Sequence, residues 1–107
     1  MKVLLDECVP LRFGVALADV DVRTARTEGW TSLRNGELLS RMRTAGFTTL
    51  VTVDRNLTYQ QNVAAVGIAV IVLHAHTNRV ADLLPLAPQV VEAIASTAPG
   101  EIAHVGA

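Results

Sequence analysis

Short apolar runs alternate with amphipathic stretches along most of the chain. Four runs are rich in Val, Ile, Leu and Thr, and each is expected to form a short strand. They are Lys2–Leu5, Val20–Thr24, Thr48–Val53 and Ile68–Leu73. Ile68–Leu73 is apolar on both faces, which is typical of a strand in a parallel sheet. A further edge strand is expected at Glu101–Val105, after a turn at Pro99–Gly100.

Helices are expected between these strands. The predicted segments are Val9–Ala18, Asn35–Thr44, Tyr59–Ala65 and a stretch from Asn78 to about Ser96. In the first segment Pro10 lies near the first turn, and Leu11, Val15 and Ala18 recur at helical spacing. The segment Ala25–Leu33 has no clear period and is predicted to be a loop that carries Trp30, which either packs in the core or contacts a partner.

The later helices carry their own start and stop signals. Asn35 is a good N-cap residue with Glu37 in the first turn, and Asn78 is a candidate N-cap for the last stretch. Pro85 and Pro88 interrupt that last stretch, so two pieces or a kink are expected. The alternation of strands and helices predicts an α/β fold, a three-layer α/β/α arrangement around a central, mostly parallel sheet of four or five strands.

Composition narrows the class of protein. The 107 residues fit one domain, taken as residues 1–107, and half of them are hydrophobic, so disorder is not expected. The longest apolar run, Val63–Leu73, is too short to cross a bilayer, and the apolar run at the N-terminus is too short for an export signal. With Cys8 as the single cysteine, a cytoplasmic protein without membrane attachment is expected.

The charge pattern gives no general nucleic-acid signature, because the formal net charge is −1. Eight of the nine basic residues are Arg, and five of these lie between Arg23 and Arg43. Arginine forks suit phosphate, although Arg-rich coding in the host would produce the same bias.

Three acids lie where such a sheet would bring side chains together. Asp6 ends the first strand, Asp54 ends the third, and Glu37 opens the helix that leads into the third strand. Right-handed crossovers bring the C-terminal ends of parallel strands to one edge. Crowded carboxylates repel unless a cation lies between them, and Mg²⁺ is the usual occupant. Thr52, Asn35 and Asn56 are candidates to supply neutral oxygens or to hold the carboxylates.

Each acid also has a purely structural explanation. Asp6 could cap the following helix, Asp54 could form the turn Asp-Arg-Asn, and Glu37 could complement a helix dipole. The joint pattern, VLLDE at the start and LVTVDRN after a helix, favours a site over three independent caps.

The segments VLLDECVP, NGELL and VTVDRNLTYQQN resemble the PIN-like domain family, in an uncharacterised group related to the VapC-type toxin ribonucleases. The resemblance extends over nearly the whole chain. It implies a PIN-like α/β/α fold, an acid cluster that binds Mg²⁺ or Mn²⁺, and metal-dependent cleavage of RNA. It also implies the toxin role of a toxin–antitoxin pair, with a small DNA-binding antitoxin as partner, and a homodimer.

Carried over by residue, Asp6 matches the first PIN acid, Asp54 the acid after the third strand, and Glu37 the acid on the middle helix. Two positions depart from the pattern. Asn35 and Asn56 stand where the wider group often has Asp, and each swap removes a negative charge while keeping an oxygen. Glu7 could compensate for the lost charge.

Several other polar residues lie beside these motifs. Tyr59 and Gln61, in the segment YQQN, are candidates to line a substrate groove, with Tyr59 stacking on a base, or else they serve as helix caps. Arg55 is a candidate phosphate contact. His74 and His76 follow the fourth strand at the edge where the acids are expected, and a metal role is one interpretation of them. Nothing near Cys8 activates a thiol.

Three functions remain open from the sequence. The first is a metal-dependent ribonuclease. The second is a phosphate-accepting receiver domain, which also pairs an early acidic doublet with a later Asp but needs a Lys near the last strand, whereas Lys2 is the single lysine. The third is a PIN-like module that has lost its chemistry and serves in binding or regulation, which Asn35 and Asn56 favour.

Overall fold

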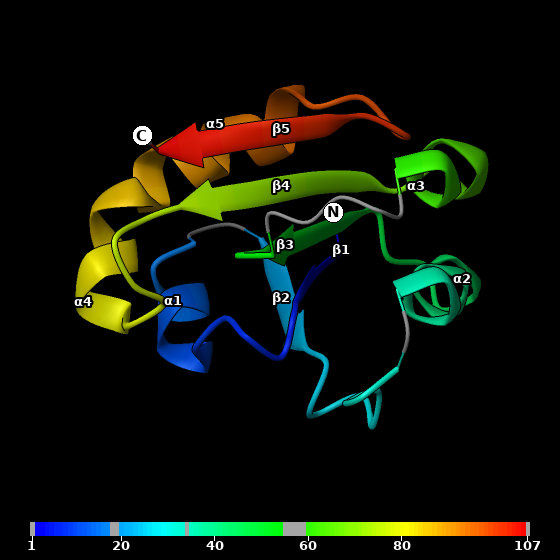
Figure 1. Ribbon diagram of the computed structural model, residues 1–107, viewed down its shortest axis with the longest axis horizontal. Coiled ribbons are helices and arrows are strands. Elements are labelled where there is room, and N and C mark those ends of the chain that lie inside the picture. Colours follow the sequence, from blue (N-terminus) through cyan, green and yellow to red (C-terminus); the bar gives the residue numbers. More distant parts are fainter. Residues whose placement is uncertain (1, 18–19, 34, 55–59, 107) are drawn as a thin grey trace.

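The computed structural model describes residues 2–17, 20–33, 35–54 and 60–106, with residues 35 and 60–62 described by their backbone alone. Strands and helices alternate along this part of the chain (Figure 1). The strands are β1 (Lys2–Leu5), β2 (Asp21–Thr24), β3 (Thr49–Thr52), β4 (Ala69–His74) and β5 (Ile102–Gly106). The helices are α1 (Leu11–Val15), α2 (Asn35–Thr44), α3 (Gln60–Val66), α4 (Val80–Leu83), the 3-10 turn η1 (Leu84–Leu86) and α5 (Ala87–Ser96).

The five strands form one parallel sheet in the spatial order β2-β1-β3-β4-β5. This confirms the predicted α/β fold class. The chain leaves β1 in one direction to reach β2 and later passes β1 in the other direction to reach β3. Such a reversal opens a crevice at the carboxyl ends of the two strands, where open α/β sheets bind ligands. Asp6 and Asp54 follow these two strands.

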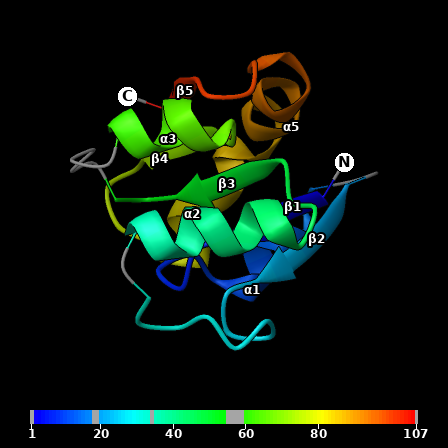
Figure 2. The same ribbon diagram turned by 90° about the vertical axis from the view of Figure 1, so that its right-hand side faces the viewer.

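Alternation along the strands divides the core into two hydrophobic clusters, one on each face of the sheet. On one face Val3 and Leu5 of β1 pack with Phe13 of α1 and with side chains of α4 and α5. On the other face Leu4 packs with side chains of α2 and α3, including Leu39. Figure 2 looks onto this second face, with α2 and α3 in front of the sheet. The helices therefore cover both faces, as the alternating pattern predicts.

The connection from β4 to β5 has an unusual hand. The steps from β3 to β4 and from β4 to β5 run in the same direction across the sheet, yet α3 lies on one face and α5 on the other. The two connections therefore have opposite hands, although about 98% of such crossovers are right-handed. The C-terminal ends still share one edge because all the strands are parallel.

The first helix is shorter than predicted and presents a different face to the core. It spans Leu11–Val15 instead of Val9–Ala18, because the backbone N–H groups of Ala16 and Leu17 bond three residues back and tighten the chain into a turn. Leu11 and Val15, which were expected on the packed face, are exposed, and Phe13 and Leu17 are buried. The predicted apolar face was therefore wrong by half a turn.

The prolines divide the last helical stretch as predicted. The chain passes from α4 through η1 into α5, with Pro85 and Pro88 each in the first turn of a new piece. The stretch begins one residue later than expected, because Arg79 is the N-cap residue and the Asn78 side chain donates instead to the carbonyl of Cys8. Among the described residues, no helix is both long and apolar enough to cross a membrane.

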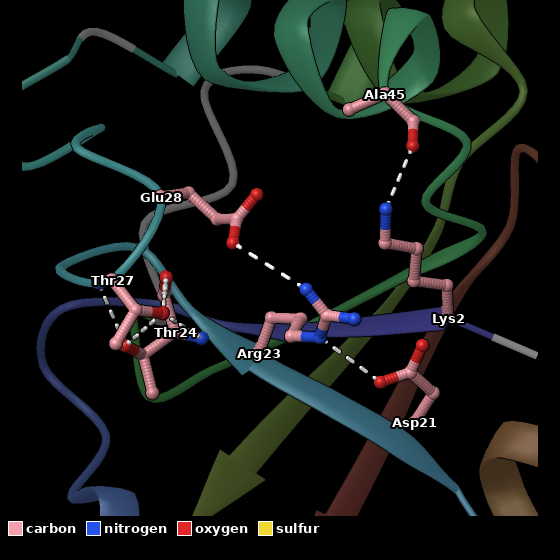
Figure 3. Close-up of polar contacts among 7 residues, drawn as sticks. All are labelled: Lys2, Asp21, Arg23, Thr24, Thr27, Glu28 and Ala45. Carbon is pink, nitrogen blue, oxygen red and sulfur yellow. Dashed lines mark hydrogen bonds and ion pairs between the residues drawn. The ribbon is translucent and has the colours of Figure 1, made fainter.

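The segment 25–33 is a loop, as predicted, and several contacts hold it (Figure 3). Thr24 and Thr27 exchange hydrogen bonds through backbone and hydroxyl groups at the start of the loop. Arg23 lies 3.0 Å from Asp21 and 4.0 Å from Glu28. Trp30 packs edge-on against Phe47, with ring centroids 5.6 Å apart. The packing interpretation of Trp30 is therefore confirmed.

Candidate functional site

Asp6 continues β1 by one residue at the carboxyl edge of the sheet. Its backbone N–H donates to the carbonyl of Val51, and its Oδ1 accepts a hydrogen bond of 2.8 Å from the backbone N–H of Glu7. Its Oδ2 accepts one of 2.8 Å from the hydroxyl of Thr52. The first turn of α1 begins at Pro10. The carboxylate is thus held at the sheet edge, and the idea that Asp6 caps the next helix is wrong.

Thr52 joins the two predicted strand-end acids. Its side chain is fully buried, and its hydroxyl donates to Asp6 while accepting a hydrogen bond of 3.0 Å from the backbone N–H of Asp54. β1 and β3 pair directly, so the condition for Asp6 and Asp54 to be neighbours is met. The buried hydroxyl therefore positions one carboxylate and the backbone of the other acid.

Two cavities flank Asp6. One, of about 310 Å³, is lined by Asp6, Glu7, Cys8, Leu33, Val53 and Asp54. The other, of about 320 Å³, extends toward β2 and includes Thr24, Arg26 and Thr27 among its lining residues. Both cavities share Asp6 and Glu7. Asp6 therefore borders two cavities, one lined also by Asp54 and the other lined also by Arg26.

Glu7 belongs to the rim of this site. Its side chain is exposed, and its Oε1 accepts a long hydrogen bond of 3.4 Å from the backbone N–H of Ser32. The bond connects the segment after β1 to the loop that precedes α2. Glu7 thus lies beside Asp6 in both cavities, although the described contact of its side chain is with the loop.

Cys8 lies against the same hydroxyl. Its Sγ is 3.6 Å from Thr52 Oγ1, and because the hydroxyl proton is directed to Asp6, the thiol is the donor in this contact. Burial raises the pKa of the Cys8 thiol above its ordinary value of 9.0, a backbone hydrogen bond at Val53 opposes this, and the charge of Asp6 raises the pKa again. Cys8 is therefore a neutral thiol at neutral pH, which excludes an activated nucleophile.

Glu37 lies apart from the two strand-end acids. It is in the first turn of α2, as predicted, but its side chain is exposed and its Oε1 is 3.4 Å from Nη2 of Arg41, one turn along the helix. Glu37 is not among the residues that line the cavity shared by Asp6 and Asp54. Within the described part of the chain, no three His, Cys, Asp or Glu side chains come close enough to hold one metal ion.

The remaining predicted site residues lie at or beyond the limits of the described structure. Arg55, Asn56 and Tyr59 are outside the described residues. Asn35 is the first residue of α2 and Gln61 the second of α3, and only their backbones are described. The predicted N-cap role of Asn35 therefore lies outside what the structure describes.

Sequence reasoning missed two features of this edge. Arg26 and Thr27 line a cavity beside Asp6 and belong to a loop without hydrophobic periodicity. Their position directly after β2 was the one signal that could have placed them at this edge of the sheet. His74 pairs with His104, with Nε2 and Nδ1 2.7 Å apart, and nothing in the sequence indicated this partner. The pairing depends on the register of β4 with β5, which the sequence of either strand does not specify.

The donor set at Asp6 and Asp54 fits Mg²⁺ or Mn²⁺. An ionised carboxylate offers about four acceptor positions, and the bonds from Glu7 and Thr52 use two of those on Asp6. Carboxylate oxygens are the ligands that Mg²⁺ prefers, and one or two carboxylates with several waters commonly suffice. The two acids could therefore hold such an ion without Glu37.

Comparisons of the chain with protein-family models, curated proteins and solved structures found no match. The resemblance to PIN-like domains therefore stays a prediction from the sequence motifs around Asp6, Glu37 and Asp54.

Proposed function

We propose that this chain is a metal-dependent ribonuclease of PIN-like type that hydrolyses RNA phosphodiester bonds. The observation that carries the proposal is the link between the two strand-end acids through the hydroxyl of Thr52, at the crevice between β1 and β3. A crevice of this kind is the usual ligand site of an open α/β sheet. The sequence motifs add the substrate class.

In this proposal Asp6 and Asp54 hold Mg²⁺ or Mn²⁺, and Thr52 fixes the orientation of Asp6. A metal ion bound there would polarise a phosphoryl oxygen and activate a water for in-line attack. Arg26, which lines the cavity on the β2 side of Asp6, would contact a neighbouring phosphate of the RNA backbone. The carboxylate and the guanidinium would thus orient one strand of RNA across the carboxyl edge of β1.

The proposed partners follow the same resemblance. The chain would act in the cytoplasm as the toxin of a toxin–antitoxin pair, inhibited by a small DNA-binding antitoxin, and it would form a homodimer. Leu11 and Val15 support a protein partner, because they leave an apolar surface on α1 with exposed fractions of 59% and 83%. Leu11 also lines the cavity beside Asp6, so a partner bound there would lie close to the site.

A second candidate function is a catalytically weakened or inactive PIN-like binding or regulatory module. The position of Glu37 favours it, because this acid pairs with Arg41 on the helix surface. Asn35 and Asn56 also carry no negative charge at positions where the PIN-like pattern often has Asp. A module of this kind would bind RNA or a protein without cleaving RNA and would bind Mg²⁺ weakly.

Cleavage of a fluorescent single-stranded RNA by the purified chain tests the proposal. We expect cleavage with Mg²⁺ or Mn²⁺, none with a chelator, and loss of cleavage in Asp6→Asn and Asp54→Asn. Asp21→Asn is the matched control. Asp21 is an exposed acid at the start of β2, at the edge of the sheet opposite to Asp6. Equal cleavage by Asp6→Asn and Asp21→Asn would exclude the proposed site, and no cleavage of any RNA would favour the binding module.

A further inference from the structure

Two histidines meet on the neighbouring strands β4 and β5. His74 Nε2 and His104 Nδ1 are 2.7 Å apart, with ring centroids separated by 5.0 Å and ring planes at 45°. The register pairs Val72 with His104 and His74 with Gly106, so the two histidines are diagonal neighbours. Val72 and Ile102 belong to the cluster under α2 and α3, so alternation places His74 and His104 on that same face.

The backbone holds this pair together independently of the side chains. β5 follows β4 in parallel register to the last residue of β4. Gly106 lies against the carbonyl of His74 with φ of +98°, and a Cβ at this position would be 2.1 Å from that oxygen. A side chain at position 106 would therefore force the strand ends apart. The glycine lets β5 stay paired until it has passed His104.

The crossover through α4 and α5 leaves the histidines accessible. These helices cover the opposite face of β4 and β5. His104 is exposed and His74 partly exposed, and β4 and β5 run side by side at this end of the sheet (Figure 1). The hydrogen-bonded pair therefore lies at the exposed surface of the sheet and not in the core.

The chemistry of the pair suits a borderline divalent cation. Two imidazole nitrogens at hydrogen-bond distance share one proton between them when both rings are neutral. A metal ion bound by both nitrogens, with the shared proton moved to the other ring nitrogen of the donor histidine, needs Zn–N distances of about 2.0–2.1 Å. These distances correspond to about 2.9–3.4 Å between the two nitrogens at ordinary coordination angles. The observed separation of 2.7 Å must open by about 0.2–0.7 Å, and the rings must turn so that both nitrogens face the ion, which the exposed His104 ring allows.

We propose that His74 and His104 form a bidentate site for a borderline divalent cation of the Zn²⁺ class, completed by water. Neutral imidazoles select Zn²⁺, Ni²⁺ or Cu²⁺ over Mg²⁺, which prefers oxygen ligands. The site is therefore separate from the acids at β1 and β3 in both its residues and its metal preference. It does not depend on ribonuclease activity.

Calorimetric titration of the full chain with Zn²⁺ at pH 7.5 tests this proposal. We expect saturable binding that weakens at least about tenfold in His104→Gln and in His74→Gln, because one ligand remains and the chelate is lost. His76→Gln is the matched control, since His76 is exposed and lies outside the pair. Cys8→Ser and Asp6→Asn should also retain the site, which distinguishes it from the acidic cavity.

Absence of Zn²⁺ binding, or equal affinity in His104→Gln and the unchanged chain, would overturn the proposal. Circular dichroism of each variant checks the fold. If His74→Gln fails to fold, His104→Gln decides alone, because the exposed side chain of His104 can be changed without disturbing the core. Absence of Zn²⁺ binding at the two histidines would not bear on metal binding at Asp6 and Asp54, which is tested with variants of those acids.

Discussion

The hydroxyl of Thr52 donates a hydrogen bond of 2.8 Å to Oδ2 of Asp6, between two directly paired parallel strands. The same oxygen accepts the backbone N–H of Asp54. One buried oxygen thereby determines how the first acid is oriented and where the second acid leaves its strand. The proposed metal site rests on this relationship.

Thr52→Val should separate the effect of orienting Asp6 from the effect of its charge, because the variant keeps the carboxylates of Asp6 and Asp54 and removes the hydroxyl that orients Asp6. We expect Mn²⁺ affinity to fall about 10- to 100-fold, the usual effect of losing a group that orients a metal ligand. The unfolding free energy should fall by about 1–3 kcal/mol, because Asp6 and the Asp54 N–H lose a partner. Calorimetry and urea denaturation measure the two effects.

Thr49→Val is the matched control for this variant. Thr49 is also a buried threonine of β3, but it lies at the opposite end of the strand and bonds to Thr48. We expect Mn²⁺ affinity to remain unchanged in Thr49→Val. Similar losses of affinity in the two variants would show that Thr52 acts through general stability alone.

The thiol of Cys8 should report the charge of Asp6. Because that charge raises the pKa of Cys8, Asp6→Asn should lower the pKa, and Asp21→Asn should leave it unchanged. Thiolate absorbance near 240 nm against pH measures the shift. A cation bound at Asp6 should act in the same direction as Asp6→Asn. An unchanged thiol pKa in Asp6→Asn would contradict the proximity of the two groups.

The raised pKa of Cys8 also predicts a pH dependence of stability. The folded chain retains the thiol proton more strongly than the unfolded chain, so this stabilisation is complete below pH 9.0 and is lost as pH rises through the folded value. The difference in unfolding free energy between the unchanged chain and Cys8→Ser should therefore shrink or reverse above pH 9. Urea denaturation of both chains at pH 7.5, 9 and 10 measures this difference.

Gly106→Ala should weaken the histidine pair by displacing the end of β5. The added Cβ would meet the carbonyl of His74. Gly46→Ala is a useful control, because Gly46 also has a positive φ, of +86°, but its Cβ would meet nothing within 4 Å. Both variants should lose roughly 1 kcal/mol of stability from backbone strain, whereas Zn²⁺ affinity should fall only in Gly106→Ala. Equal Zn²⁺ affinity in the two variants would contradict this role of Gly106.

Much of the fold follows from local pattern. Lys2–Leu5 and Asn35–Thr44 were predicted with the bounds that the structure has, because an apolar run before a strand-end acid and a polar residue opening an amphipathic segment are strong local signals. The break at Pro85 and Pro88 was equally predictable, since proline lacks the N–H that a continuous helix needs.

The errors arise where distant contacts override local pattern. Leu11 and Val15 have helical spacing, but Phe13 is larger and occupies the core instead. The partner of His74 is 30 residues away and depends on strand register. The placement of Glu37 depends on the loop that Trp30 anchors against Phe47, and no sequence period describes that loop.

The proposed metal site at Asp6 and Asp54 is tested most directly by titration of the chain with Mn²⁺, followed by electron paramagnetic resonance of free Mn²⁺. We expect one saturable site per chain, weakened at least about tenfold in Asp6→Asn and in Asp54→Asn and unchanged in Asp21→Asn. Saturation that is the same in Asp6→Asn and Asp21→Asn, or no saturable binding by the unchanged chain, would contradict it.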